Sequence, residues 1–177
     1  MADFITCFNW MLPNENGKPP YEKNPDGCPK GCVGPCYAIA GVNSGAFPAQ
    51  FAAIAAIPQA ERGPAVQHFY LTEFWNSWFA QISSNGLAQR IFDEAVNAGE
   101  ETAVLILQKA INVLSAIHVA VDGKWGPTTV AAANACNQLS LTGEFIQLRC
   151  AHYRAIYASN PTKYANDLAG WLARAEK

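Results

Sequence analysis

A single acidic residue, Glu15, stands where an apolar helix is expected to give way to a loop dense in glycine and proline. A carboxyl group at such a junction can lean against the helix and keep its proton, which a general acid needs. The sequence therefore makes Glu15 the first candidate for a catalytic acid. The surrounding Asn14-Glu15-Asn16-Gly17 also has the composition of a solvated turn, and that plainer interpretation stands beside the catalytic one.

Cleavage of a glycosidic bond usually takes two carboxyl groups. One protonates the leaving oxygen, and the other stabilises the sugar cation or activates water. Three acids are candidates for the second role: Glu22 and Asp26 in the loop, and Asp93 on a later helix. Each is more readily explained as a surface or capping residue, so the sequence leaves the second acid open.

Aromatic side chains with polar edges suit the C–H faces and the hydroxyl groups of a sugar ring. Most aromatic residues at helical spacing nevertheless belong to the core, which is the alternative for each candidate. The candidates for lining a sugar-binding cleft are Tyr21, Tyr37, Tyr70, Trp75 and Trp78.

Three cysteines, Cys28, Cys32 and Cys36, are spaced four residues apart in a stretch where glycine and proline disfavour a helix. Three thiolates and a fourth ligand such as His68 could bind a metal ion. The spacing matches no standard zinc pattern, and the histidines lack a paired spacing such as HExxH. We therefore predict neither a metal nor a cofactor, and favour a loop closed by a disulfide or carrying free thiols.

The elements expected to position these residues are helices, so the predicted class is mostly α. Asp3 can cap a first helix that Pro13 ends, and Pro127 suits the first turn of a later one. The stretch 14–48 is predicted to be irregular, with room for a short hairpin. Apolar periodicity predicts further helices over 50–57, 63–74, 85–98, 101–114, 144–158 and 164–175.

The 177-residue chain has the composition of a folded protein, since half of its residues are apolar and 15% are charged. Its length suits one globule. A net charge of −2 without a run of lysine or arginine argues against nucleic acid as a partner. No apolar stretch approaches the roughly 20 residues of a membrane span, and the first residues do not have the pattern of a secretory signal.

Several segments, taken in order, resemble the glycoside hydrolase family 108 muramidases, which occur among phage endolysins and bacterial secretion activators with an attached peptidoglycan-binding region. Together they cover most of residues 65–177. The segments are Tyr70-x4-Trp75, IFDEAVNAG at 91–99, Leu107-Gln108, VDGKWGPTT at 121–129, Arg149 with Tyr153, and GWLAR at 170–174.

The resemblance implies a lysozyme-like helical fold with a long loop rich in cysteine, glycine and proline near the N-terminus. It implies a catalytic region over 1–98 and a peptidoglycan-binding-like helical region over 99–177, packed together as one globule. Glu15 would be the general acid that cleaves the β-1,4 bond between N-acetylmuramic acid and N-acetylglucosamine. Tyr21, Tyr70, Trp75 and Asn97 would bind the substrate, and a structural role for Asp93 and Asn97 within FDEAVNAG is the alternative.

The partner implied by the resemblance is the glycan strand of peptidoglycan, and the protein is expected to be a monomer that does not insert into membranes. It would be made in the cytoplasm without a signal peptide and act in the periplasm or cell wall after lysis or non-classical export. In that family a Glu-Gly-Gly-Tyr-like motif follows the first helix, and the corresponding stretch here, Glu15-Asn16-Gly17 with Tyr21, departs from it. This leaves a second hypothesis, a non-catalytic peptidoglycan-binding or secretion-assisting protein on the same scaffold.

Overall fold

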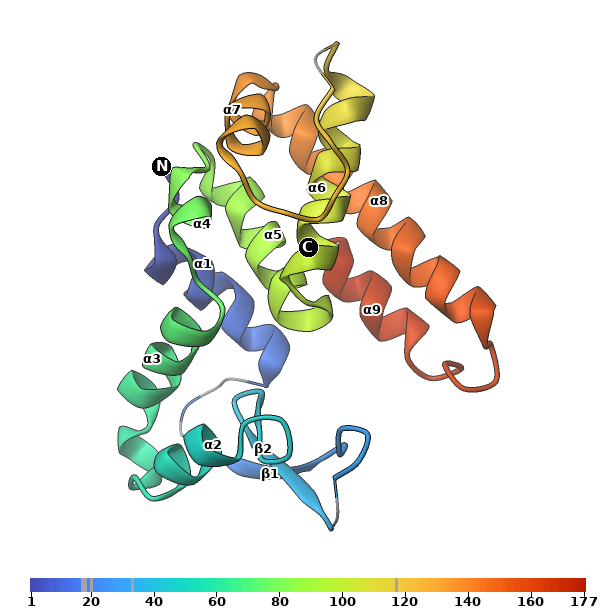
Figure 1. Ribbon diagram of the computed structural model, residues 1–177. Helices are drawn as coiled ribbons and strands as arrows, with labels where there is room; N and C mark the ends of the chain where they lie inside the picture. The colour runs from blue at the N-terminus through green and yellow to red at the C-terminus, as the bar shows by residue number, and fades with distance from the viewer. Residues whose placement is uncertain (17–18, 20, 33, 117) are drawn as a thin grey trace. The chain divides into compact units, whose positions relative to one another are not determined.

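The computed structural model describes residues 1–16, 19, 21–32, 34–116 and 118–177. The described chain is mostly helical with one small sheet (Figure 1). It divides into two compact units. The helical unit comprises Met1–Cys7 and Asn76–Lys177, and the hairpin unit comprises Phe8–Trp75. Within the described ranges, no helix combines the length and apolar character needed to cross a membrane.

The first helix, α1 (Phe4–Met11), begins and ends as its sequence predicts. The Asp3 carboxylate accepts a 3.0 Å hydrogen bond from the Thr6 N–H and so caps the first turn. The chain then tightens into a short 3-10 helix, η1 (Leu12–Glu15), because Pro13 cannot donate the hydrogen bond that a continued α-helix would require. Glu15 is therefore the last residue of a helical turn.

The loop that follows contains a three-stranded antiparallel sheet, where the sequence predicted only room for a short hairpin. Its strands are β1 (Lys23–Asp26), β2 (Cys36–Ile39) and β3 (Val42–Asn43), in that order across the sheet. Asp26 pairs with Cys36, and Ile39 pairs with Val42. The strands have at most four residues, too few to show an alternating pattern in the sequence.

Two helices and an aromatic cluster complete the hairpin unit. Helix α2 (Pro48–Ala55) packs on β2 and β3 (Figure 1), and α3 (Gly63–Glu73) follows a short 3-10 helix, η2 (Gln59–Glu61). Both helices were predicted, with bounds that differ by one or two residues. Phe69 on α3 packs edge-to-face against Phe47, with ring centroids 4.9 Å apart. The aromatic cluster is Phe8, Phe47, Phe69, Tyr70 and Phe74.

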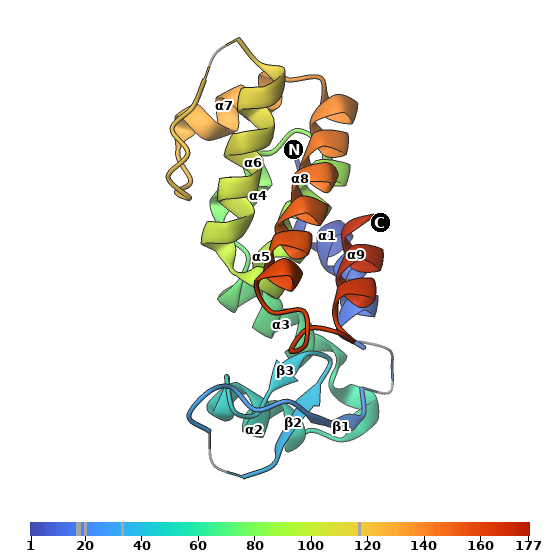
Figure 2. The same ribbon diagram turned by 90° about the vertical axis from the view of Figure 1, so that its right-hand side faces the viewer.

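The helical unit is built around three helices that pack on one another, α5, α6 and α8, with α9 against α8 (Figure 2). Side-chain caps start α4, α5 and α8, where Asn76, Ser84 and Asn137 accept backbone N–H bonds. Its helices are α4 (Ser77–Gln81), α5 (Asn85–Ala98), α6 (Glu100–Leu114), α7 (Pro127–Ala135), α8 (Gln138–Ser159) and α9 (Leu168–Ala175).

Three of these helices agree with the prediction: α5 and α6 lie within one residue of their predicted bounds, and α7 begins at Pro127 as expected. The other three differ. Helix α8 begins six residues before the predicted 144 because the Asn137 side chain caps it, accepting from the Ser140 N–H at 3.0 Å. Helix α9 begins at Leu168 rather than 164, after a series of turns. Helix α4 was not predicted, because five residues are too few to establish a helical period.

Candidate active site

A small cavity of about 150 Å3 lies in the hairpin unit, where η1 meets the sheet. Two carboxyl groups line it, Glu15 from the end of η1 and Asp26 from the end of β1. Amide side chains contribute much of the remaining polar wall, namely Asn14, Asn16 and Asn24. The fold thus brings the candidate general acid into one cavity with one of the three candidates for the second carboxyl group.

Glu15 takes its position from the way η1 ends. Asn16 adopts a left-handed backbone conformation, φ 54°, which asparagine tolerates better than most residues, and its N–H bonds to the Leu12 carbonyl. The Glu15 side chain is half-buried beside Gly41. A Cβ atom built on Gly41 would lie 2.7 Å from Glu15 Oε2, so the carboxyl group occupies the space that a side chain at 41 would need.

The turn between β2 and β3 consists of Ala40 and Gly41, and both have positive φ angles, 49° and 79°. The buried Tyr70 hydroxyl donates a 2.8 Å hydrogen bond to the Ala40 carbonyl and holds the turn in place. A Cβ atom on Gly41 would also lie 2.5 Å from that hydroxyl. Glu15, Gly41 and Tyr70 therefore meet at one point of the turn, although they come from η1, the sheet and α3.

Tyr70 therefore acts at this site through its hydroxyl. Its side chain is only 1% exposed, and its ring packs against Phe8, Phe69 and Phe74. A ring enclosed in this way has no free face on which a sugar could stack. The structure gives Tyr70 the task of positioning Ala40 and Gly41, which is different from the direct substrate contact expected from the sequence.

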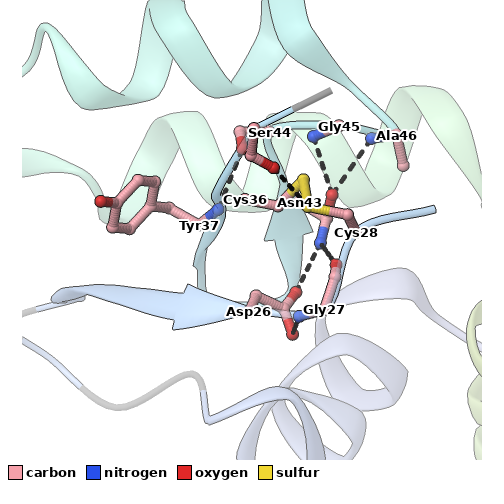
Figure 3. The surroundings of a disulfide bond; sticks show 10 residues. Asp26, Gly27, Cys28, Cys36, Tyr37, Asn43, Ser44, Gly45 and Ala46 are labelled. Carbon is pink, nitrogen blue, oxygen red and sulfur yellow. Dashed lines mark hydrogen bonds between the residues drawn. A yellow bond between two sulfur atoms is a disulfide. The ribbon is translucent and has the colours of Figure 1, made fainter. Parts of the chain in front are cut away.

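Asp26 is held by a network that the sequence did not reveal (Figure 3). Its Oδ2 accepts a 2.6 Å hydrogen bond from the Asn43 side chain, and its Oδ1 accepts from the Gly27 N–H at 2.8 Å. The Asn43 oxygen in turn accepts from the N–H groups of Gly45 and Ala46. Asn43 thus ties the end of β1 to the chain after β3. An asparagine followed by Ser44 and Gly45 has the composition of an ordinary turn, so the local sequence does not indicate the hydrogen bond from Asn43 to Asp26.

The remaining substrate-binding candidates are not among the described residues that line this cavity. Tyr21 has a left-handed backbone, φ 53°, its carbonyl accepts a 2.8 Å bond from Arg62, and its ring lies beside Gly63. Trp75 is half-buried at the end of the hairpin unit. Asn97 belongs to the helical unit, where its amide donates a 2.6 Å bond to the Tyr153 hydroxyl. Their roles in binding stay predictions.

The cysteine-rich loop contains both features that the sequence left open. Cys28 and Cys36 form a disulfide, and Cys32 between them is an exposed free thiol. The bond joins the chain just after β1 to the first residue of β2, so it closes the hairpin next to Asp26. Among the described residues, no three or more histidine, cysteine or acidic side chains are grouped so that they could hold a metal ion.

The DGKWGPTT turn of the helical unit is held by one buried glutamine. The Gln108 side chain accepts from the N–H groups of Asp122 and Gly123, at 3.0 and 2.9 Å, and donates to the Asp122 carboxylate at 2.8 Å. This last bond lowers the pKa of Asp122. A cavity of about 370 Å3 borders the turn, with Lys124 and Trp125 in its wall. The turn is thus a preformed surface feature as well as the start of α7.

Buried charges join α5 to α8 in the helical unit, and they give Asp93 a structural role in place of the surface or capping role that the sequence suggested. Asp93, Glu94 and Arg149 are all 0% exposed, so Asp93 is neither a surface nor a capping residue. Arg149 bonds to Asp93 at 2.5 Å and also to Glu94. Arg174 on α9 reaches Asp93 at 3.0 Å. Burial disfavours the Arg149 charge, but the two carboxylates outweigh it and hold the Arg149 pKa above its usual value.

Residues 102–176 match a protein-family model described as "Predicted Peptidoglycan domain". A solved structure of Brucella abortus SagA is similar to this chain with a TM-score of 0.59 at 19% identity, covering 98% of this chain and 93% of that chain. No curated protein matches. The chain therefore has a mostly α, lysozyme-like fold, and the family match supports an association with peptidoglycan.

Proposed function

We propose that the protein is a peptidoglycan hydrolase, an N-acetylmuramidase that cleaves the β-1,4 bond between N-acetylmuramic acid and N-acetylglucosamine with Glu15 as general acid. One observation carries the proposal: Glu15 and Asp26 line the same cavity. The close packing of Gly41 against Glu15 and the Asn43 bond to Asp26 give each carboxyl group a defined place. Two positioned carboxyl groups are what glycosidic cleavage requires.

The surroundings of the two acids suit two different roles. Asp26 accepts a hydrogen bond on each oxygen from an N–H donor, as an ionised carboxylate does. It is the group to stabilise the developing sugar cation or to direct water at it. Glu15, half-buried against Gly41, would protonate the leaving glycosidic oxygen. The amide side chains of the cavity wall offer donors and acceptors to the N-acetyl and hydroxyl groups of the sugars.

The substrate class rests on residues 102–176, whose family match supports peptidoglycan as the partner. We propose that the protein meets this partner in the periplasm or cell wall after release or non-classical export. The Cys28–Cys36 disulfide is consistent with an oxidising compartment, because such bonds are rare in reducing ones. Under the proposal, the 102–176 region holds the glycan strand while the hairpin unit cleaves it.

The decisive experiment measures the clearing of a peptidoglycan suspension together with the release of reducing sugar. Glu15→Gln removes the proton donor and keeps the shape of the side chain, so the rate should fall by about 10²–10⁴-fold. Glu22→Gln is the matched control, since Glu22 is an exposed neighbour in the chain that is not among the described residues lining the cavity. A Glu15→Gln protein that folds and keeps the wild-type rate would remove Glu15 from the mechanism.

A second candidate function, a non-catalytic peptidoglycan-binding or secretion-assisting protein, is favoured by one observation. The family match covers only residues 102–176 and leaves Glu15 and Asp26 outside it. This alternative predicts that the protein sediments with insoluble peptidoglycan while no reducing sugar appears. Release of reducing sugar by the wild type, abolished in Glu15→Gln, would exclude it.

A further inference from the structure

The free thiol of Cys32 lies beside a disulfide, and Gly45 provides the space for this arrangement. A Cβ atom built on Gly45 would lie 2.6 Å from Cys32 Sγ and 3.0 Å from Cys36 Sγ. Both sulfur atoms therefore border the same glycine, whose missing side chain leaves them room. Figure 3 shows Gly45 next to the disulfide, with its N–H held by Asn43.

Cys32 also differs from the other free cysteines in its access to solvent. It is exposed, whereas Cys7 and Cys150 are buried and Cys136 is half-buried. Burial raises the pKa of Cys7 to about 12, which suppresses its thiolate. Cys32 is thus the free cysteine among the described residues that combines solvent access with a neighbouring disulfide, and both favour thiol–disulfide exchange.

We propose that Cys32 exchanges with the Cys28–Cys36 disulfide, so that the hairpin carrying Asp26 exists in two disulfide forms. The Cys32 thiolate bonds to Cys36 Sγ while the bond between Cys36 and Cys28 breaks. The electron pair of that bond leaves on Cys28, which takes up the proton that Cys32 lost. One disulfide is exchanged for another, so the step needs no oxidant or reductant.

The surroundings of Cys28 suit the protonated thiol that the exchange produces. Its sulfur lies 3.0 Å from the Gly34 carbonyl oxygen, which can accept a hydrogen bond from the released thiol. Cys32 is four residues from either partner, so the reacting sulfur atoms are held at high effective concentration by a short stretch of chain. The exchange is therefore intramolecular, and its rate is independent of protein concentration.

The exchange would act on the proposed active site through Asp26, and this consequence rests on the proposed function. The Cys28–Cys36 bond ties the residue two positions after Asp26 to the strand residue that pairs with Asp26. In the Cys32–Cys36 form this covalent tie is gone, and Asp26 is held by its strand pairing with Cys36 and by the hydrogen bonds of its carboxylate to Asn43 and Gly27. Catalysis depends steeply on the position of the catalytic carboxylate. The form with the Cys32–Cys36 disulfide, in which Asp26 is less firmly held, should therefore be the less active one.

The exchange itself is tested by thiol mapping, which needs no hydrolase activity. Full-length protein is incubated at about pH 8 without reductant, quenched in acid, alkylated and mapped by mass spectrometry. We expect a Cys32–Cys36 linked peptide to appear while the alkylating label grows on Cys28, with the total of free thiols unchanged. In Cys32→Ser, neither Cys28 nor Cys36 should take label. A wild type in which Cys32 alone of the three is labelled at all times would overturn the proposal.

A trapped form provides the second test. Cys28→Ser should form the Cys32–Cys36 disulfide on oxidation with a glutathione redox pair, and failure to form it in a folded protein would contradict the exchange. Oxidised Cys28→Ser should release reducing sugar from peptidoglycan at least about tenfold more slowly than Cys32→Ser, which retains the original disulfide. Equal rates would refute the regulatory consequence. If the wild type shows no hydrolysis, the proposed function fails, and thiol mapping still decides the exchange.

Discussion

The Tyr70 hydroxyl donates a hydrogen bond of 2.8 Å to the carbonyl oxygen of Ala40, thirty residues away in the sequence. Ala40 is buried, with 4% of its surface exposed, and it has a positive φ that alanine rarely adopts. The bond therefore satisfies a buried acceptor in a conformation that needs support. Because Gly41 follows directly and packs against the Glu15 carboxyl group, the placement of Glu15 depends on this contact.

Tyr70→Phe tests that dependence. The substitution leaves the Ala40 carbonyl buried without its donor, which should lower the free energy of unfolding by about 1–3 kcal/mol. We also expect slower release of reducing sugar at saturating peptidoglycan, because the turn beside Glu15 loosens. Chemical denaturation and rate measurements check the two effects. Tyr37→Phe is the control, since no hydrogen bond of the Tyr37 hydroxyl is found among the described residues, and both quantities should stay near wild type.

Gly41→Ala should disrupt the site by direct contact. The new methyl group would meet Glu15 Oε2 at 2.7 Å and the Tyr70 hydroxyl at 2.5 Å, so both must move. We expect loss of most of the hydrolytic activity and a destabilisation of at least about 1–3 kcal/mol. Gly31→Ala separates this effect from backbone strain, because Gly31 has a similar positive φ of 92° but no atom within 4 Å of the added carbon. Equal losses in the two variants would attribute the effect to strain alone.

Asn43→Asp places a second carboxylate against Asp26. The oxygen that accepts from Gly45 and Ala46 is retained, but the donor to Asp26 Oδ2 at 2.6 Å becomes an acceptor. Repulsion between the two acids should displace the Asp26 carboxylate and lower activity. The rate of reducing-sugar release measures this. Asn137→Asp adds the same charge at the N-cap of α8, where aspartate is equally favourable, and should leave the rate unchanged.

Helix caps, helix-starting prolines and apolar periodicity predicted most of the longer helices, because each of these features acts within a few residues. The Asp3 cap, the Pro127 start and the apolar face of 85–98 all correspond to observed helices. The division of the chain into regions 1–98 and 99–177 stays a prediction, and the two compact units divide at other positions. A short hairpin was expected as a possibility in 14–48, but the number and bounds of the strands were not predicted, because each strand is shorter than the pattern that would identify it.

Contacts between residues far apart in the sequence could not be predicted from the sequence, for a physical reason. Asp93 lies 56 residues from Arg149, and nothing in the sequence around either residue shows that they pair. From sequence alone, a charged residue whose partner is unknown is predicted to be exposed, because burying an unpaired charge is strongly unfavourable. The same limit applies to Gly41, whose need for a glycine comes from Glu15 in a different element. The sequence identified Glu15 and Asp26 as candidates but not the contacts that position them.

Alkaline unfolding provides a test of the buried network around Tyr153. Burial, and then the nearby Glu94 carboxylate, raise the pKa of Tyr153 to about 12, against an ordinary value of 10.0. The folded state thus favours the protonated phenol, and the corresponding stability is present in full below pH 10 and is lost as the pH rises to about 12. Burial raises the pKa of Cys7 from 9.0 to about 12 in the same direction.

Tyr153→Phe should therefore change both the free energy of unfolding at neutral pH and the way in which this free energy varies with pH. At neutral pH the variant loses the 2.6 Å bond from the phenol to Glu94 and leaves Asn97 without its acceptor, so its free energy of unfolding should be lower than that of the wild type. Between pH 10 and about 12 its stability should fall less steeply, because the group that titrates there is gone. Cys7→Ala should flatten the profile from about pH 9 instead. Parallel profiles for wild type and Tyr153→Phe would show that the phenol is not coupled to folding.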